Sequence, residues 1–318
     1  MNGSGPPRAA PSSPHTPPAG GHETIRVGTA GWSYPDWEGV VYPVPSPPRF
    51  DRLRWLASFL DVVEINSTFY RPARRKDALT WVERVAANPR FRFCAKLGRV
   101  FTHEPERENR GSEKAFKDGI EPLADAGLLA AVLVQFPYSF KNTASNRRRL
   151  ADVLTRFGEY SLAVELRHGS WMAAGIMAFL AARGVALVGI DQPQVGQPVP
   201  PSLPLTGPFA YARLHGRNAA NWFRRGAGRD ARYDYLYSAE ELAPWIRGLQ
   251  RAAGEKTQGI VIANNHFRGK AAVNAVEIRH SLSGRMVPAP APLLAAYPRL
   301  ASLAVPLPPP QGAPPRLF

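Results

Sequence analysis

The sequence contains one cysteine and no long apolar run. Because Cys94 is the single cysteine among 318 residues, an internal disulfide and a zinc site built from several thiolates are excluded, and a reducing compartment is expected. The longest apolar stretch is about half a membrane span, and residues 1–20 lack the apolar core of a secretion signal. We therefore expect a soluble, cytoplasmic protein with no membrane partner.

Several motifs that carry defined chemistry are also missing. The chain has no P-loop, no Ser-His-Asp order of a hydrolase and no helix pattern with paired histidines. The segment GTAGWSY at 28–34 follows the first expected strand but is not a Gly-rich phosphate fingerprint, which counts against a dinucleotide-binding fold.

Proline is abundant and concentrated at the two ends. Of 33 prolines, 6 lie in residues 1–22 and 10 in residues 288–318, and neither segment has apolar periodicity. Both are therefore predicted to be disordered tails. The region between them, 23–287, is long enough for one well-buried core and is predicted to be a single domain.

The charge balance is strongly basic. Lys and Arg number 40 against 25 Asp and Glu, a formal net charge of +15, and little of the excess lies in the tails. An anionic partner is therefore considered, whether a phosphate ester, a nucleic acid or a membrane surface. Because most of these cations are arginine in a chain rich in Ala and Pro, coding bias is an equally simple explanation of the composition.

Short runs typical of fully buried strands alternate with segments of helical spacing. Strands that alternate with helices imply right-handed crossovers and a parallel sheet, and a count of eight favours closure into a (β/α)8 TIM-type barrel, with a doubly wound open sheet as the alternative. The expected strands are 25–31, 62–67, 91–96, 131–136, 162–167, 185–191, 209–216 and 259–265.

Helices are expected between most of these strands. Asp51, Asn146 and Ser238 are predicted as N-caps. The connection at 192–208 contains too many prolines for a helix and is predicted to be a loop between strands six and seven. The expected helices are 51–60, 76–87, 113–129, 146–157, 171–183, 239–253 and 271–282.

The apolar runs end in polar or charged residues. Alternate residues of a strand share a face, so Glu165 and Arg167 should point together, as should Arg213 and His215. Unpaired charges are costly inside a barrel, which leaves the open mouth at the carboxyl ends of the strands as their expected place. The predicted site residues at strand ends are Glu64, Asn66, Lys96, Gln135, Glu165, Arg167, His168, Asp191, Arg213, His215 and Asn264.

These residues allow more than one role. We assign proton transfer to Glu165, with Glu64 and His215 as the other catalytic candidates, and anion binding to Lys96, Arg167 and Arg213. A structural ion network is the alternative reading. If a divalent metal is used, its expected ligands are Glu64, Glu165, Asp191 and His215.

Aromatic residues follow several of the expected strands. Trp32 and Tyr70 are interpreted as substrate-binding residues, because such rings stack on a base or sugar, although packing over the barrel end would place aromatic residues there as well.

With these residues assembled, the chain resembles the YecE-like family, domain of unknown function 72. The resemblance spans about 26–282 and rests on seven ordered motifs, GTAGWSYPDW (28–37), EINSTFYR (64–71), Lys96 with Thr102 and His103, QFPYSF (135–140), AVELRHGSW (163–171), YARLHGRN (211–218) and NN…A..NA (264–275). It implies a (β/α)8 barrel and leaves the reaction open.

Two function classes follow. The first is an enzyme, of the hydrolase or lyase class, that uses acid–base chemistry on a small phosphorylated or carboxylated substrate. The second is a nucleic-acid binding or processing protein, including metal-dependent phosphodiester hydrolysis.

Overall fold

The computed structural model describes residues 21–310 apart from 173, 174, 223, 225, 227 and 256. Its centre is a nearly closed parallel sheet in which β1 lies between β2 and β9, so the first and last strands of the predicted barrel are paired. The strands are β1 Ile25–Ala30, β2 Val62–Ile65, β3 Arg92–Lys96, β4 Leu129–Gln135, β5 Leu162–Glu165, β6 Ala186–Leu187, β7 Gly189–Asp191, β8 Phe209–Leu214 and β9 Gln258–Ala263.

The sixth predicted strand forms two short strands, β6 and β7, separated at Val188. β6 pairs with β5 and β7 pairs with β8, while the backbone N–H of Val188 donates to the carbonyl of Val164 at 2.9 Å. One extended segment therefore joins the two edges of the sheet. The predicted TIM-type barrel is confirmed, and its sixth strand is divided into the two short strands β6 and β7.

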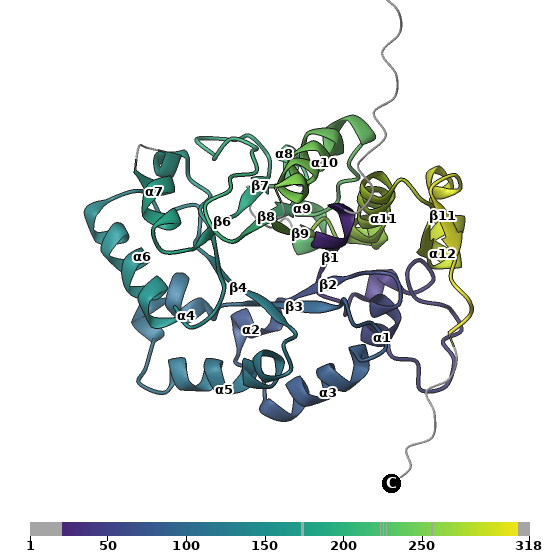
Figure 1. The fold of residues 1–318 in the computed structure, drawn as a ribbon, viewed down its shortest axis with the longest axis horizontal. Coiled ribbons are helices and arrows are strands. Elements are labelled where there is room, and N and C mark those ends of the chain that lie inside the picture. The colour runs from purple at the N-terminus through teal and green to yellow at the C-terminus, as the bar shows by residue number, and fades with distance from the viewer. Residues whose placement is uncertain are drawn as a thin grey trace, which may run out of the picture.

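Helices surround the strands on the outside (Figure 1). The connection between β7 and β8 has no helix at residues 192–208, as the prolines predict. The helices are α1 Arg52–Ala57, α2 Ser67–Tyr70, α3 Arg75–Val85, α4 Arg99–Thr102, α5 Ser112–Asp125, α6 Ala144–Arg156, α7 Ile176–Ala181, α8 Ala219–Trp222, α9 Arg229–Arg232, α10 Ala239–Gly254, α11 Lys270–Ser283 and α12 Ala291–Ala296. Among the described residues, none of the helices has the length and apolar character needed to span a membrane.

Capping residues explain where several helices begin. The side chain of Asp51 accepts from the backbone N–H of Arg54, and Ser238 forms a capping box with Glu241 at the start of α10. The predicted cap Asn146 is wrong: α6 begins two residues earlier, because the Thr143 hydroxyl accepts from the N–H of Asn146.

Strand residues alternate between the barrel interior and the helix layer. Interior positions form one apolar cluster, which includes Val62, Cys94, Leu133 and Ile190, whereas intervening residues pack in two clusters beneath the helices. The same alternation continues past the strand ends and determines which polar side chains face the mouth.

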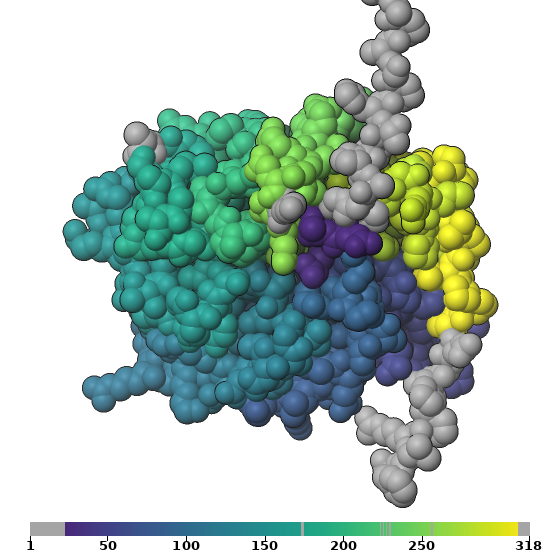
Figure 2. All heavy atoms as spheres, viewed as in Figure 1, coloured from purple at the N-terminus to yellow at the C-terminus, as the bar shows by residue number. Residues whose placement is uncertain are grey.

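The prediction of a disordered tail after residue 288 is wrong for residues 288–310. Val287–Ala289 (β10) pairs in parallel with Ala304–Pro306 (β11), and α12 lies between them. Prolines occupy the first turns of α12 and of the 3-10 helix Pro298–Leu300, positions that tolerate a residue without an N–H. In Figure 2 this segment, in yellow, forms a continuous surface beside α11. Of the predicted N-terminal tail, 1–22, residues 1–20 lie outside the described residues, and the last two residues begin the 3-10 helix Gly21–Thr24.

This C-terminal segment is expected to stabilise the barrel. Leu293 is fully buried and its Cδ1 lies close to Gly269, at the start of α11. Leu293→Ala should lower the free energy of unfolding by about 2–4 kcal/mol in urea denaturation, because it leaves a cavity in the core. Leu79→Ala is the control, since that side chain is 49% exposed. A loss no larger than the control's would show that the segment is only loosely attached.

Candidate functional site

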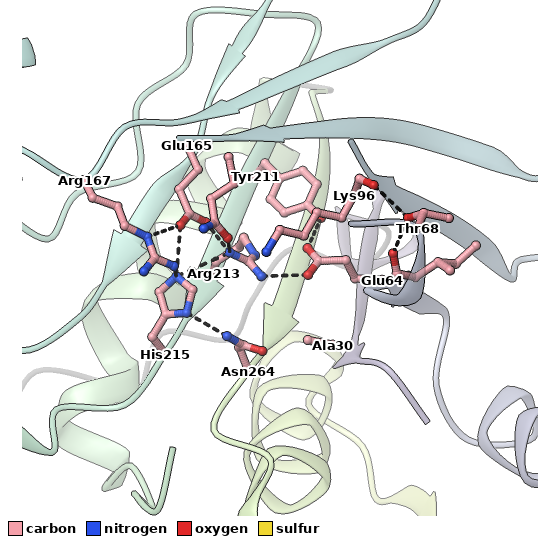
Figure 3. A network of polar contacts seen from close by, with 12 residues as sticks. Ala30, Glu64, Thr68, Lys96, Glu165, Arg167, Tyr211, Arg213, His215 and Asn264 are labelled. Carbon is pink, nitrogen blue, oxygen red and sulfur yellow. Dashed lines mark hydrogen bonds and ion pairs between the residues drawn. The ribbon is translucent and has the colours of Figure 1, made fainter. Parts of the chain in front are cut away.

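A buried arginine lies at the centre of the candidate site. Arg213, from β8, extends between two carboxylates: its Nη2 donates to Oε1 of Glu64 at 2.6 Å, and its Nη1 donates to Oε2 of Glu165. The same Nη1 donates to Oε1 of Gln135 at 3.3 Å. These residues come from β2, β4, β5 and β8, and Figure 3 shows Arg213 lying between the two glutamates.

The remaining carboxylate oxygens also have donors. Oε2 of Glu64 accepts from the Tyr211 hydroxyl at 3.0 Å, and Oε1 of Glu165 accepts from Nε of Arg167 at 2.6 Å. Burial raises the pKa of Glu165, but Arg213 and Arg167 outweigh burial and hold that pKa well below its usual range. Against its own burial, Arg213 has its pKa raised by Glu165 and Glu64. Glu165 and Arg213 therefore stay charged.

His215 is a neutral neighbour of this network. Its Nδ1 lies 2.8 Å from Nδ2 of Asn264, and its Nε2 lies 3.5 Å from Oε1 of Glu165 and 3.4 and 3.5 Å from guanidinium nitrogens of Arg167 and Arg213. Burial, aided by Arg167 and Arg213, lowers the pKa of His215 to about 3, although Glu165 opposes the shift. His215 is thus an imidazole, not a cation, at neutral pH.

Lys96 ends β3 beside the network. Its ammonium group lies 4.0 Å from the centroid of the Phe69 ring and makes no hydrogen bond or ion pair within the described residues. Burial and the neighbouring Arg213 lower its pKa to about 7, against the opposing effect of Glu64 and Glu165. The residue is partly exposed, and it is the last residue of β3, at the carboxyl end of the barrel.

Other residues at the mouth were not among the predicted site residues. The His103 ring meets the edge of Phe69 at a centroid distance of 4.9 Å, and burial together with Lys96 and Arg167 lowers the pKa of His103 to about 4. On the other side, the rings of Trp222 and Tyr233 lie 6.1 and 6.4 Å from that of His215. Of these, His103 belongs to a quoted motif, but its place beside Phe69 depends on the fold of the loop after β3.

The predicted placement of Asp191 in this site is wrong. Ile190 occupies the barrel interior, so Asp191 points into the helix layer, where it binds Arg217 through contacts of 2.7 and 2.8 Å and accepts from the Trp245 indole at 2.9 Å. Gln192, two residues after Ile190, lies on the mouth side instead and donates to the Arg167 carbonyl.

Four other predicted residues lie outside the network. His168 points away from Arg167 and contacts Ser170 through Nδ1. Trp32 packs edge-on against Trp81 of α3 at 5.6 Å, and so belongs to the packing beneath the helices. Tyr70 is 68% exposed, and Asn66 makes no side-chain hydrogen bond within the described residues.

Of the four conditional metal ligands, Asp191 does not lie with the other three. Asp191 faces away, Glu64 and Glu165 bind Arg213, and the described residues contain no group of three His, Cys, Asp or Glu side chains suited to a metal ion. The side chains at the mouth that can still bind a ligand are cationic, so they suit an anion better than a metal ion.

Comparisons with known proteins agree with this architecture. The model of the family described as protein of unknown function DUF72 matches residues 26–295, so the chain belongs to this family. The UPF0759 protein YunF of Bacillus subtilis is 29% identical over 270 residues, which cover 80% of this chain and 93% of that protein.

Two crystal structures of DUF72 family proteins are similar. The one from Thermotoga maritima has a TM-score of 0.72 and 32% identity, covering 81% of this chain and 98% of that chain. The one from Enterococcus faecalis at 3.10 Å resolution has a TM-score of 0.69 and 29% identity, covering 81% and 95%.

Removing one charge from the central ion network is expected to reduce stability. Removing its charges together is expected to cost much less. Arg213→Met leaves two buried carboxylates without their shared cation and should cost about 3–5 kcal/mol in urea denaturation. The triple variant Glu64→Leu, Glu165→Leu and Arg213→Met removes those charges together and should recover most of the loss. A triple variant no more stable than the single one would contradict this account.

His215 should make stability depend on acidity. Because its pKa is about 3 in the folded protein and near the ordinary value of 6.5 when unfolded, the unfolded chain binds more protons between these values, and lowering the pH favours unfolding. His215→Gln removes this contribution. The variant's free energy of unfolding should therefore fall less steeply from pH 6.5 to 4.5, as measured by urea denaturation, and equal slopes would contradict the assignment.

Proposed function

We propose that this DUF72 protein is an enzyme that binds a small anionic substrate at the mouth of the barrel and transfers a proton to or from it. The observation that carries the proposal is the order of charges from the interior outward. The side chains of Glu64 and Glu165 are 0% exposed and that of Arg213 is 1% exposed, whereas Arg167 is 15% exposed and Lys96 is half-buried. An entering molecule therefore meets cations and not carboxylates.

Arg167 is suited to hold a carboxylate or phosphate. Its Nε is fixed on Glu165, and its Nη2 has only a 3.4 Å contact with His215. Its Nη1 has no hydrogen bond within the described residues. The outer edge of the guanidinium thus remains open for two parallel hydrogen bonds to an anion, the geometry that arginine favours. Glu165 orients this group.

Proton transfer is better assigned to Lys96 than to Glu165. A general acid or base works best when its pKa is near the working pH, and the pKa of Lys96 is about 7 while that of Glu165 is held low. Glu64 and Glu165 are positioning residues in this proposal, because their oxygens are bound to Arg213, Arg167 and Tyr211. His215 and Asn264 line the site as neutral groups. A hydrolase or lyase reaction is compatible with this arrangement.

The alternative of nucleic-acid binding has weaker support. Arginines near the carboxyl ends of the strands are engaged with carboxylates, as in the pairs of Arg99 with Glu104 and of Arg217 with Asp191. A surface that tracks phosphates needs cations free to bind them along its length. The compact set of cations at the mouth better matches a small molecule.

Inorganic phosphate should stabilise the protein through Arg167. At about ten times its dissociation constant, phosphate should add about 1.4 kcal/mol, a rise in Tm of about 3 °C in thermal unfolding. Arg167→Gln should lose most of this rise. Arg148→Gln, which removes the same charge from an exposed position on α6, should keep it.

Two outcomes would contradict the proposal. An equal phosphate response in Arg167→Gln and in the control would remove Arg167 as the anion site. Stabilisation by a single-stranded oligonucleotide, steeply reduced by salt and without a response to phosphate, would favour the nucleic-acid alternative.

A further inference from the structure

We infer that the Lys96 amine forms an imine with the carbonyl group of the substrate, so that the substrate is an aldehyde or ketone bearing a carboxylate or phosphate. The inference rests on the proposed function, since the anionic group is held at Arg167. It deepens that function by naming the reacting bond and the class of substrate.

The first reason is that the carboxylates near Lys96 are already occupied. Both oxygens of Glu64 accept hydrogen bonds, from Arg213 and Tyr211, and both oxygens of Glu165 accept from Arg213 and Arg167. Within the described residues, the Lys96 nitrogen is left with the face of an aromatic ring and no acceptor. Because every oxygen of these two carboxylates already accepts a hydrogen bond, the position of Lys96 does not suit a role in an ion pair.

The second reason is the set of charges that surround the amine. Arg213 from β8 and Arg167 from β5 disfavour the ammonium form, whereas Glu64 from β2 and Glu165 from β5 favour it. Two further groups are near the amine. His103 stays uncharged, and the face of the Phe69 ring attracts the ammonium form. Burial adds to the two arginines, so the amine titrates at about pH 7. Desolvation and a neighbouring cation are the conditions that make a lysine nucleophilic.

The chemical step balances with groups in the mouth. The nitrogen lone pair attacks the carbonyl carbon, one nitrogen proton passes to the carbonyl oxygen, and a second proton taken up from solvent converts the resulting hydroxyl into water, whose departure leaves a protonated imine. His103 is neutral at this pH and, like the Lys96 nitrogen, contacts the Phe69 ring, so we assign it the relay of a proton between the nitrogen and the departing water. When an adjacent C–C bond breaks, the protonated imine accepts its electron pair and becomes an enamine, while the other fragment leaves as CO2 or, after its hydroxyl has lost a proton, as a carbonyl compound. Protonation of the enamine carbon restores the imine, and hydrolysis by water then frees the lysine. This sequence favours the lyase class.

Reductive trapping tests the inference on the full chain. The protein is incubated at pH 7 with glyoxylate, an aldehyde that carries a carboxylate, together with cyanoborohydride, which reduces an imine to a stable amine. Peptide mass mapping then gives the labelled fraction of each lysine. At this pH an ordinary lysine has about a thousandfold less free amine than one with the pKa of Lys96. We expect Lys96 to be labelled at least tenfold more than the exposed Lys76 and Lys141.

Two further comparisons complete the test. Arg167→Gln should reduce labelling of Lys96 by glyoxylate at least tenfold, while labelling by the uncharged acetaldehyde should change less than threefold. Lys96→Arg should abolish the mapped adduct yet retain stabilisation by phosphate. Labelling of Lys96 at or below the level of the two exposed lysines with both aldehydes would overturn the inference. If phosphate still stabilised the protein in that case, the anion site would stand without the imine, so the two failures are distinguishable.

Discussion

The structure of the site depends on a single constraint, the burial of one guanidinium between two carboxylates. Arg213 can stay charged in the barrel interior only because Glu64 and Glu165 lie on either side of it, and each glutamate is fully buried for the same reason. These side chains start from β2, β5 and β8, so their contacts fix the relative position of three strands across the barrel. Desolvating three charges costs about as much free energy as their pairing returns, which makes such a network a poor means of stabilising a core. Its presence at the mouth is better explained by the side chains that it positions.

What it holds is an asymmetric distribution of charge around the opening. Each carboxylate binds Arg213 through one oxygen. The other oxygen of Glu165 binds Nε of Arg167 and leaves Nη1 of that guanidinium without a hydrogen bond within the described residues. With these acceptors filled, Lys96 has no hydrogen-bond or ion-pair partner among the described residues, and burial together with Arg213 destabilises its ammonium form. The same geometry therefore produces a fixed cation and a lysine that loses its proton near neutral pH. Neither property belongs to a residue on its own.

Much of this could be predicted from the sequence, because it depends on periodicity. Buried apolar runs predicted the strands, and the rule that alternate residues share a face predicted that Glu165 and Arg167 point together and that Arg213 and His215 do the same. The predicted position of Asp191 is wrong, although the same rule applies to it. The interior face of its strand runs from Ile190 to Gln192, so Asp191 between them faces the helix layer. The proline-rich C-terminal segment was misjudged because composition does not reveal that its prolines occupy helix starts and a short strand pair.

The remaining features could not be predicted from the sequence for a physical reason. Whether a glutamate is a proton-transfer group or an anchor depends on how many donors reach its oxygens, and those donors come from residues 48 and 149 positions away in the chain. The strand periodicity predicts Glu165 beside Arg167, as observed, whereas its two arginine partners disfavour the predicted role in proton transfer. The same reasoning underlies the role that we propose for Lys96, because a lysine near arginines and occupied carboxylates is more reactive than one near free carboxylates. In this barrel, the saturation of the acidic groups decides which basic group remains available for chemistry.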